Sequence, residues 1–181
     1  FNFYAGVYAT ESQDNPVTDI ILSNIRVFDV DGIFVYGPFF LWAFVIGLGL
    51  KSPKYAPFLF QSIAVFLLTR SLFVSLTHIG PFPDHITITS NLIAKFTLGG
   101  DLFFSGHTGL PFLMALVFWE NVYLRILFLF ASVFFGVVVL MGHLHYSIDV
   151  LAAFFITYTI FHISKYLFRK DYEMFHGKNS V

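Results

Sequence analysis

Long apolar stretches are the feature that most constrains the fold of this chain. Five of them are long enough, or nearly long enough, to cross a bilayer, which takes about 20 apolar residues. They lie at residues 33–50, 55–79, 105–119, 124–141 and 148–168. The chain is 57% hydrophobic and only 12% charged, well outside the usage of soluble proteins. The sequence therefore predicts an all-α, polytopic transmembrane helix bundle with five visible spans.

These stretches organise residues 1–181 as a single membrane domain with a transmembrane core at 33–168. Residues 1–32 are acidic and too polar to span. The span count and the positive charges described below predict that they lie outside the cytoplasm. The chain begins with Phe1 rather than Met, and we expect its aromatic start to be the interfacial end of a further, sixth span. Residues 169–181 are predicted to be a polar cytoplasmic tail.

Two segments allow more than one interpretation. The stretch at 105–119 is short for a crossing, so its helix is expected to begin earlier or the bilayer to thin around it. In the loop at 84–106, residues 86–90 alternate like a short strand, whereas residues 91–96 fit an interfacial helix. Both readings of this loop stay open.

The positive charges predict the orientation. Five spans place two of the turns and the C-terminus on one side, and most Lys and Arg residues lie there. They are Lys51, Lys54, Arg125, Lys165, Arg169, Lys170 and Lys178. By the positive-inside rule this side is cytoplasmic. We expect the candidate site to face the opposite, extracytoplasmic side, either periplasmic or lumenal. The Phe-rich composition, with 26 Phe, and the short loops favour a bacterial inner-membrane protein.

Arg70 lies inside the second apolar stretch, where a charged side chain costs about 3 kcal/mol on insertion scales. Such a residue usually faces a cavity or a partner. The outer part of the same helix is hydrophilic, with Ser71, Ser75, Thr77 and His78, so the guanidinium can extend toward the non-cytoplasmic surface. A structural pair with a carboxylate is the alternative.

His145 and Asp149 open the last apolar stretch at a spacing of i, i+4, which stacks them on one helix face. There the carboxylate can accept the ring N–H, which fixes the tautomer and leaves the other ring nitrogen free to attack. An interfacial histidine without a catalytic role is the alternative.

Ser105, Gly106 and His107 stand where the third apolar stretch begins. A helix N-terminus presents unpaired N–H groups and positive dipole, which suit a phosphate, and Gly106 allows close backbone approach. His107 would then be placed to protonate a leaving oxygen. Ser105 can equally be a plain N-cap, and Asp101 either orients this loop or caps the helix.

His143, His145 and Asp149 also allow a metal site, because His and Asp are common zinc ligands. Residues i and i+2 point apart on a helix and no further ligand is obvious, so a metal-dependent hydrolase is kept as a third possibility. The chain has no Cys, which excludes disulfides, thiolate ligands and a cysteine nucleophile. It also has no basic run typical of nucleic-acid binding.

Together, residues 105–107 and the His145-x-x-x-Asp149 pair resemble the last two motifs of the type 2 phosphatidic acid phosphatase superfamily, P-S-G-H and S-R-x5-H-x3-D. The finer resemblance is to its sphingomyelin synthase-like branch. In that branch Gly-Asp precedes Ser-Gly-His-Thr, and His-Tyr-x-x-Asp-Val opens the last span. This chain has those residues at 100–101, 105–108 and 145–150.

The resemblance implies a six-span membrane enzyme in which His145 attacks phosphorus to form a phosphohistidine. Asp149 would support that histidine, and His107 would be the acid for the leaving group. The phosphate-binding and supporting residues would be Arg70, Ser105, Gly106 and Asp101. No metal or other cofactor would be needed, and the substrate would be a membrane lipid: a phospholipid, diacylglycerol or ceramide-like molecule.

Four positions depart from the family pattern. Ile63 stands where the family has Lys, and Ser71 rather than Pro follows Arg70. Phe104 replaces the Pro before Ser-Gly-His, and Val139 replaces the Arg of the last motif. Because the synthase-like branch lacks several of the same residues, the departures favour it over simple phosphatidate hydrolysis. The leading hypothesis is transfer of a phospho-headgroup between lipids or to water. A non-catalytic transporter or scaffold with a structural Arg, His and Asp cluster is the alternative.

Overall fold

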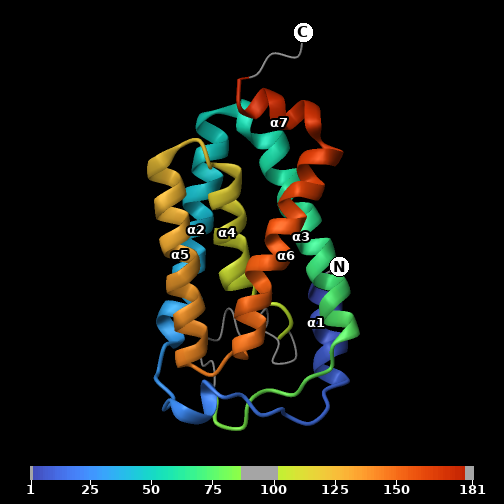
Figure 1. Ribbon diagram of the computed structural model, residues 1–181, viewed down its shortest axis with the longest axis vertical. Coiled ribbons are helices and arrows are strands. Elements are labelled where there is room, and N and C mark those ends of the chain that lie inside the picture. Colours follow the sequence, from blue (N-terminus) through green and yellow to red (C-terminus); the bar gives the residue numbers. More distant parts are fainter. Residues whose placement is uncertain (1, 87–101, 178–181) are drawn as a thin grey trace.

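A computed structural model describes residues 2–86 and 102–177, and all regular elements in these ranges are helical. Four of the described helices are long and apolar enough to cross a membrane. They are α2 (Asp31–Lys51), α3 (Ala56–Leu76), α5 (Val122–Met141) and α6 (Ser147–Leu167). Their bounds agree with the predicted spans to within about three residues, and the predicted polytopic helix bundle is confirmed (Figure 1).

The remaining predicted span is the short helix α4 (Gly106–Val117). Its 12 residues rise only about 18 Å, against a hydrocarbon core of about 30 Å. The helix lies among the long helices, and Leu113, Ala115 and Val117 are fully buried. Its first turn lies well inside the bundle rather than level with the ends of α5 and α6 (Figure 1). The residues that open α4 are therefore held below the protein surface.

The turns that connect the helices separate to the two ends of the bundle. The turn between α2 and α3, the turn before α5 and the C-terminal helix lie at one end (Figure 1). The segments at 12–30, 77–86 and 142–146 lie at the other end, which is where α4 and α6 begin. The predicted orientation requires the same arrangement, with these two turns and the C-terminus on one side. Which end faces the cytoplasm stays a prediction.

The segments at the second end are bound to one another through Tyr146, whose side chain is buried. Its hydroxyl donates to the carbonyl oxygen of Gly80 at 2.8 Å and accepts from the N–H of Val17 at 3.2 Å. Gly80 is required here because a Cβ at this position would collide with the backbone of Asp14. Three segments far apart in sequence thus meet directly beside His145.

Two helices were not expected from the sequence. α1 (Asn2–Glu11) packs along α3, with Ala5 and Ala9 against Val74. α7 (Arg169–Phe175) occurs where a polar tail was predicted, because Phe175 is buried among aromatic side chains. The strand and helix alternatives for the loop at 84–106 fall mostly on residues 87–101, outside the described residues.

Candidate active site

The two sequence segments singled out above are joined directly by their backbones. The N–H of Ser105 donates to the carbonyl oxygen of Asp149 at 3.2 Å. The hydroxyl of Ser105 accepts from the N–H of Thr108 at 3.4 Å, so Ser105 is the N-cap of α4. Its side chain is fully buried. Of the two roles considered for Ser105, capping is the one described by these contacts, and phosphate binding stays a prediction.

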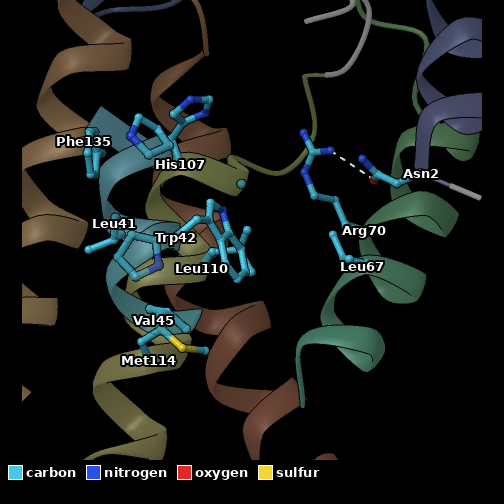
Figure 2. Close-up of a pocket in the computed structure, with 13 residues that line it drawn as sticks. Asn2, Leu41, Trp42, Val45, Leu67, Arg70, His107, Leu110, Met114 and Phe135 are labelled. Atoms are coloured by element: carbon cyan, nitrogen blue, oxygen red, sulfur yellow. Dashed lines mark hydrogen bonds between the residues drawn. The ribbon is translucent and has the colours of Figure 1, made fainter. Parts of the chain in front are cut away.

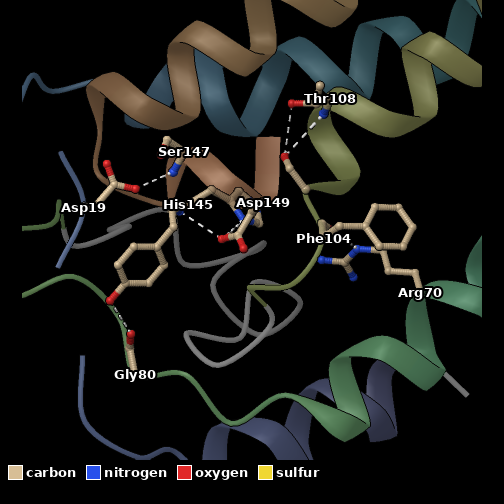
Figure 3. A network of polar contacts seen from close by, with 10 residues as sticks. Asp19, Arg70, Gly80, Phe104, Thr108, His145, Ser147 and Asp149 are labelled. Carbon is tan, nitrogen blue, oxygen red and sulfur yellow. Dashed lines mark hydrogen bonds and ion pairs between the residues drawn. The ribbon is translucent and has the colours of Figure 1, made fainter. Parts of the chain in front are cut away.

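His145 and Asp149 face each other at the beginning of α6 (Figure 3). The Nδ1 atom of His145 lies 3.5 Å from Oδ2 of Asp149. The same Oδ2 accepts the N–H of Tyr146 at 2.9 Å, so the carboxylate also caps the helix. Both side chains are buried. With Nδ1 directed at the carboxylate, Nε2 is the ring nitrogen on the side away from it.

The ring of His107 is held by Phe34 on α2. Its Nε2 atom lies 3.2 Å from the carbonyl oxygen of Phe34, and the two rings stack with centroids 4.1 Å apart. A carbonyl oxygen only accepts, so Nε2 donates and holds the hydrogen. That carbonyl lacks the usual helical partner four positions later, because this residue is Pro38, which has no N–H.

Arg70 reaches from α3 to the segment that opens α4. Its Nε donates to the carbonyl oxygen of Phe104 at 3.0 Å, and Nη1 donates to Oδ1 of Asn2 at 3.3 Å. A Cβ at Gly106 would lie only 3.2 Å from Nε of Arg70, so the absence of a side chain there lets the guanidinium lie against the backbone. Only 6% of Arg70 is exposed.

These groups share one region of the molecule. The backbone bond from Ser105 to Asp149 joins the start of α4 to the start of α6. Arg70, Gly106 and His107 also line a cavity of about 180 Å³ (Figure 2). Side chains from α3, α4 and α6 therefore come together where α4 and α6 begin.

The structure does not place every predicted residue. Asp101 lies outside the described residues. His143 is buried at a positive φ of 53° and packs edge-on against Phe82. Among residues 2–86 and 102–177, no three His, Cys, Asp or Glu side chains are grouped so as to hold a metal ion.

Asp19 is a residue of this region that the sequence interpretation missed. Its Oδ2 accepts the N–H of Ser147, the first residue of α6, at 2.7 Å (Figure 3). Its Oδ1 accepts the N–H groups of Ile21 and Leu22 at 2.8 and 3.1 Å. Burial raises the pKa of Asp19, but these hydrogen bonds outweigh it and lower the pKa below 3.8. Nothing in the sequence pairs an acidic residue at 19 with a helix that begins at 147.

Comparison with known families identifies the segment that contains these residues. Residues 99–166 match the family model described as PAP2 superfamily C-terminal. The matched segment comprises α4, α5 and nearly all of α6, and it includes Ser105, His107, His145 and Asp149. Arg70 lies before it. The matched segment is less than half of the chain, and its similarity to the PAP2 superfamily, whose members are phosphatases, supports a phosphatase-type activity. No curated protein and no solved structure matches the chain.

Proposed function

We propose that this protein is an integral membrane enzyme that removes or transfers the phospho-headgroup of a lipid, in the manner of the sphingomyelin synthase-like branch. One observation supports this more than any other: the Ser105 N–H binds the Asp149 carbonyl. This bond places the first turn of α4, whose N–H groups can bind a phosphate, next to the pair formed by His145 and Asp149. The family match over residues 99–166 supports the same reaction class.

The phosphate is bound by Arg70 and by the first turn of α4. The N–H groups of a helix's first turn have no intrahelical partner and point toward an anion. Gly106 leaves this backbone open next to the guanidinium, and Ser105 keeps the turn in place by capping it. Asp101, which lies outside the described residues, is proposed as a further supporting residue.

The first chemical step forms a bond between phosphorus and Nε2 of His145 while the bond from phosphorus to the leaving oxygen breaks. Asp149 accepts a hydrogen bond from the Nδ1–H of His145 in this step and stabilises the positive ring that forms. The leaving oxygen takes the electron pair of the broken bond and a proton from His107. For this step His107 carries a hydrogen on each ring nitrogen: Nε2 keeps its hydrogen and donates it to Phe34, and the proton on Nδ1 passes to the leaving oxygen.

The second step regenerates the enzyme. An acceptor oxygen attacks the phosphohistidine and gives its proton to Nδ1 of His107. The phosphorus–nitrogen bond breaks, and its electron pair returns to His145. With water as acceptor the enzyme is a phosphatase, and with the hydroxyl of diacylglycerol or a ceramide-like lipid it is a transferase. The first half of the reaction is common to both outcomes.

The test uses the purified protein in liposomes that contain a headgroup-labelled phospholipid, with and without a lipid alcohol. We expect headgroup loss in at least one condition and a labelled protein intermediate after rapid quenching. His145→Ala should abolish both signals, and His107→Ala should slow turnover. His162→Ala is the matched control, because His162 is an exposed residue of the same helix α6.

Absence of headgroup loss in both conditions refutes the proposal. Variants that change only stability indicate the scaffold alternative.

A further inference from the structure

The cavity beside Arg70 and His107 continues into an apolar cleft. Figure 2 shows its walls: α2 and α4 on one side and α3 on the other. Polar groups line one end, where Arg70 with its partner Asn2, Gly106 and His107 lie. The rest of the wall is hydrophobic. The apolar lining includes Leu41, Trp42, Val45, Leu110 and Met114.

The cleft runs along α4 away from the surface. From Gly106 to Met114 the helix rises by about 12 Å at 1.5 Å per residue. Because α4 already begins inside the bundle, the far end of the cleft lies at the depth of the hydrocarbon core. No water is available there to solvate a polar ligand. The occupant that fits this end is therefore a hydrocarbon chain.

We propose that the cleft binds the part of one alkyl or acyl chain nearest the phosphate of the substrate, and that Trp42 determines how this chain fits. This inference rests on the proposed function, since the phosphate at Arg70 places the chain at the mouth of the cleft. The cavity of about 180 Å³ equals the liquid volume of about six water molecules. That space accepts the first several carbons of one chain, and a second chain stays in the bilayer.

Trp42 is the largest side chain along this path. Figure 2 places it beside Leu110, between His107 at the polar end and Val45 with Met114 at the far end. A chain that enters from the phosphate must pass the indole before it reaches Met114. The opposite face of α2 bears Phe40, which is 69% exposed and does not line the cavity. The two aromatic residues therefore provide a matched pair on one helix.

The test measures turnover of n-alkyl phosphates from ethyl to dodecyl phosphate by the purified full chain in detergent. For wild type we expect kcat/KM to rise by up to about fourfold per added methylene and then to reach a plateau once the cleft is full. Trp42→Ala should move the plateau to longer chains. Val45→Phe, which narrows the far end, should lower kcat/KM for the longer esters at least tenfold more than kcat/KM for ethyl phosphate. Phe40→Ala should behave as wild type.

For each ester, dividing kcat/KM of the variant by kcat/KM of wild type cancels the effect of ester partition into the detergent. Equal turnover of all chain lengths by wild type, or a Val45→Phe variant that keeps the wild-type profile, overturns the inference while the proposed function stands. If no ester is turned over, the proposed function has failed, and the cleft is tested by binding alone. An alkyl phosphate with a photoreactive diazirine near its tail should then label α2 or α4 at the cleft. Labelling confined to other segments overturns the inference.

Discussion

The ring of His107 donates a hydrogen bond to the backbone carbonyl of Phe34, with 3.2 Å between Nε2 and the oxygen. In an unbroken helix that carbonyl would accept the N–H four residues later, and Pro38 supplies none. Because Pro38 does not compete for it, the Phe34 carbonyl in α2 can accept from His107 in α4, and this bond keeps a hydrogen on Nε2 of the ring. On the mechanism proposed above, this leaves Nδ1 as the proton-transferring atom.

Pro38→Ala tests this relationship. Alanine restores an N–H that competes with His107 for the Phe34 carbonyl, so we expect kcat to fall about tenfold, as for one lost hydrogen bond. The melting temperature should not fall, because Pro is less favourable than Ala inside a helix by about 3 kcal/mol. Pro57→Ala is the control, since Pro57 lies in the first turn of α3 where no helical bond is missing. Unchanged kcat in Pro38→Ala would contradict the assigned role.

Asp149→Asn separates orientation of His145 from helix capping. The amide oxygen can still accept the N–H of Tyr146, so the fold should persist. It cannot stabilise a positive imidazole ring, and we expect kcat to drop by about 10³- to 10⁴-fold, as in other histidine–carboxylate pairs. Circular dichroism and steady-state kinetics measure the two effects. Asp84→Asn, an exposed aspartate at the same end of the bundle, should have wild-type kinetics.

Gly106→Ala tests the contact between the guanidinium and the start of α4. The added Cβ would lie 3.2 Å from Nε of Arg70. It would push the guanidinium away from the position proposed for the phosphate at the first turn of α4. We expect KM to rise about tenfold or more, which corresponds to one hydrogen bond to a charged group. Gly47→Ala is the matched control, because a Cβ there meets nothing within 4 Å. Equal KM values for the two variants would show that Gly106 has no special role.

Asp19 predicts a pH dependence of stability. Its pKa is lowered in the folded protein, so its contribution is fully present above the unfolded value of about 3.9. The contribution is lost as the pH falls through the lower folded pKa. Asp19→Ala should be less stable at pH 7 by about 1–3 kcal/mol, because the Ser147 N–H loses its acceptor. Below about pH 4 its unfolding curve should approach that of wild type. A constant difference at all pH values would rule out this linkage.

The absence of Cys makes the orientation directly measurable. We expect Ser23→Cys, at the end where α6 begins, to react with a membrane-impermeant maleimide in intact cells. Glu120→Cys, in the exposed turn before α5, should react only after permeabilisation. The reverse labelling pattern would place the candidate site on the cytoplasmic side.

Much of the fold could be predicted from the sequence because a bilayer demands long apolar helices, and their lengths and ends can be recognised locally. The shortness of α4 and the polar groups at the starts of α4 and α6 are equally local features. α7 was missed because its helix depends on Phe175 packing against residues of distant helices.

The sequence by itself determined which residues have the chemistry: a buried arginine, two histidines and a carboxylate at helix starts. Only the tertiary structure decided their arrangement. The Phe34 carbonyl beside His107, Arg70 against Gly106, and Asp19 on the first turn of α6 each join residues far apart in the chain. Such contacts have no local signature, because they arise from the way whole helices pack.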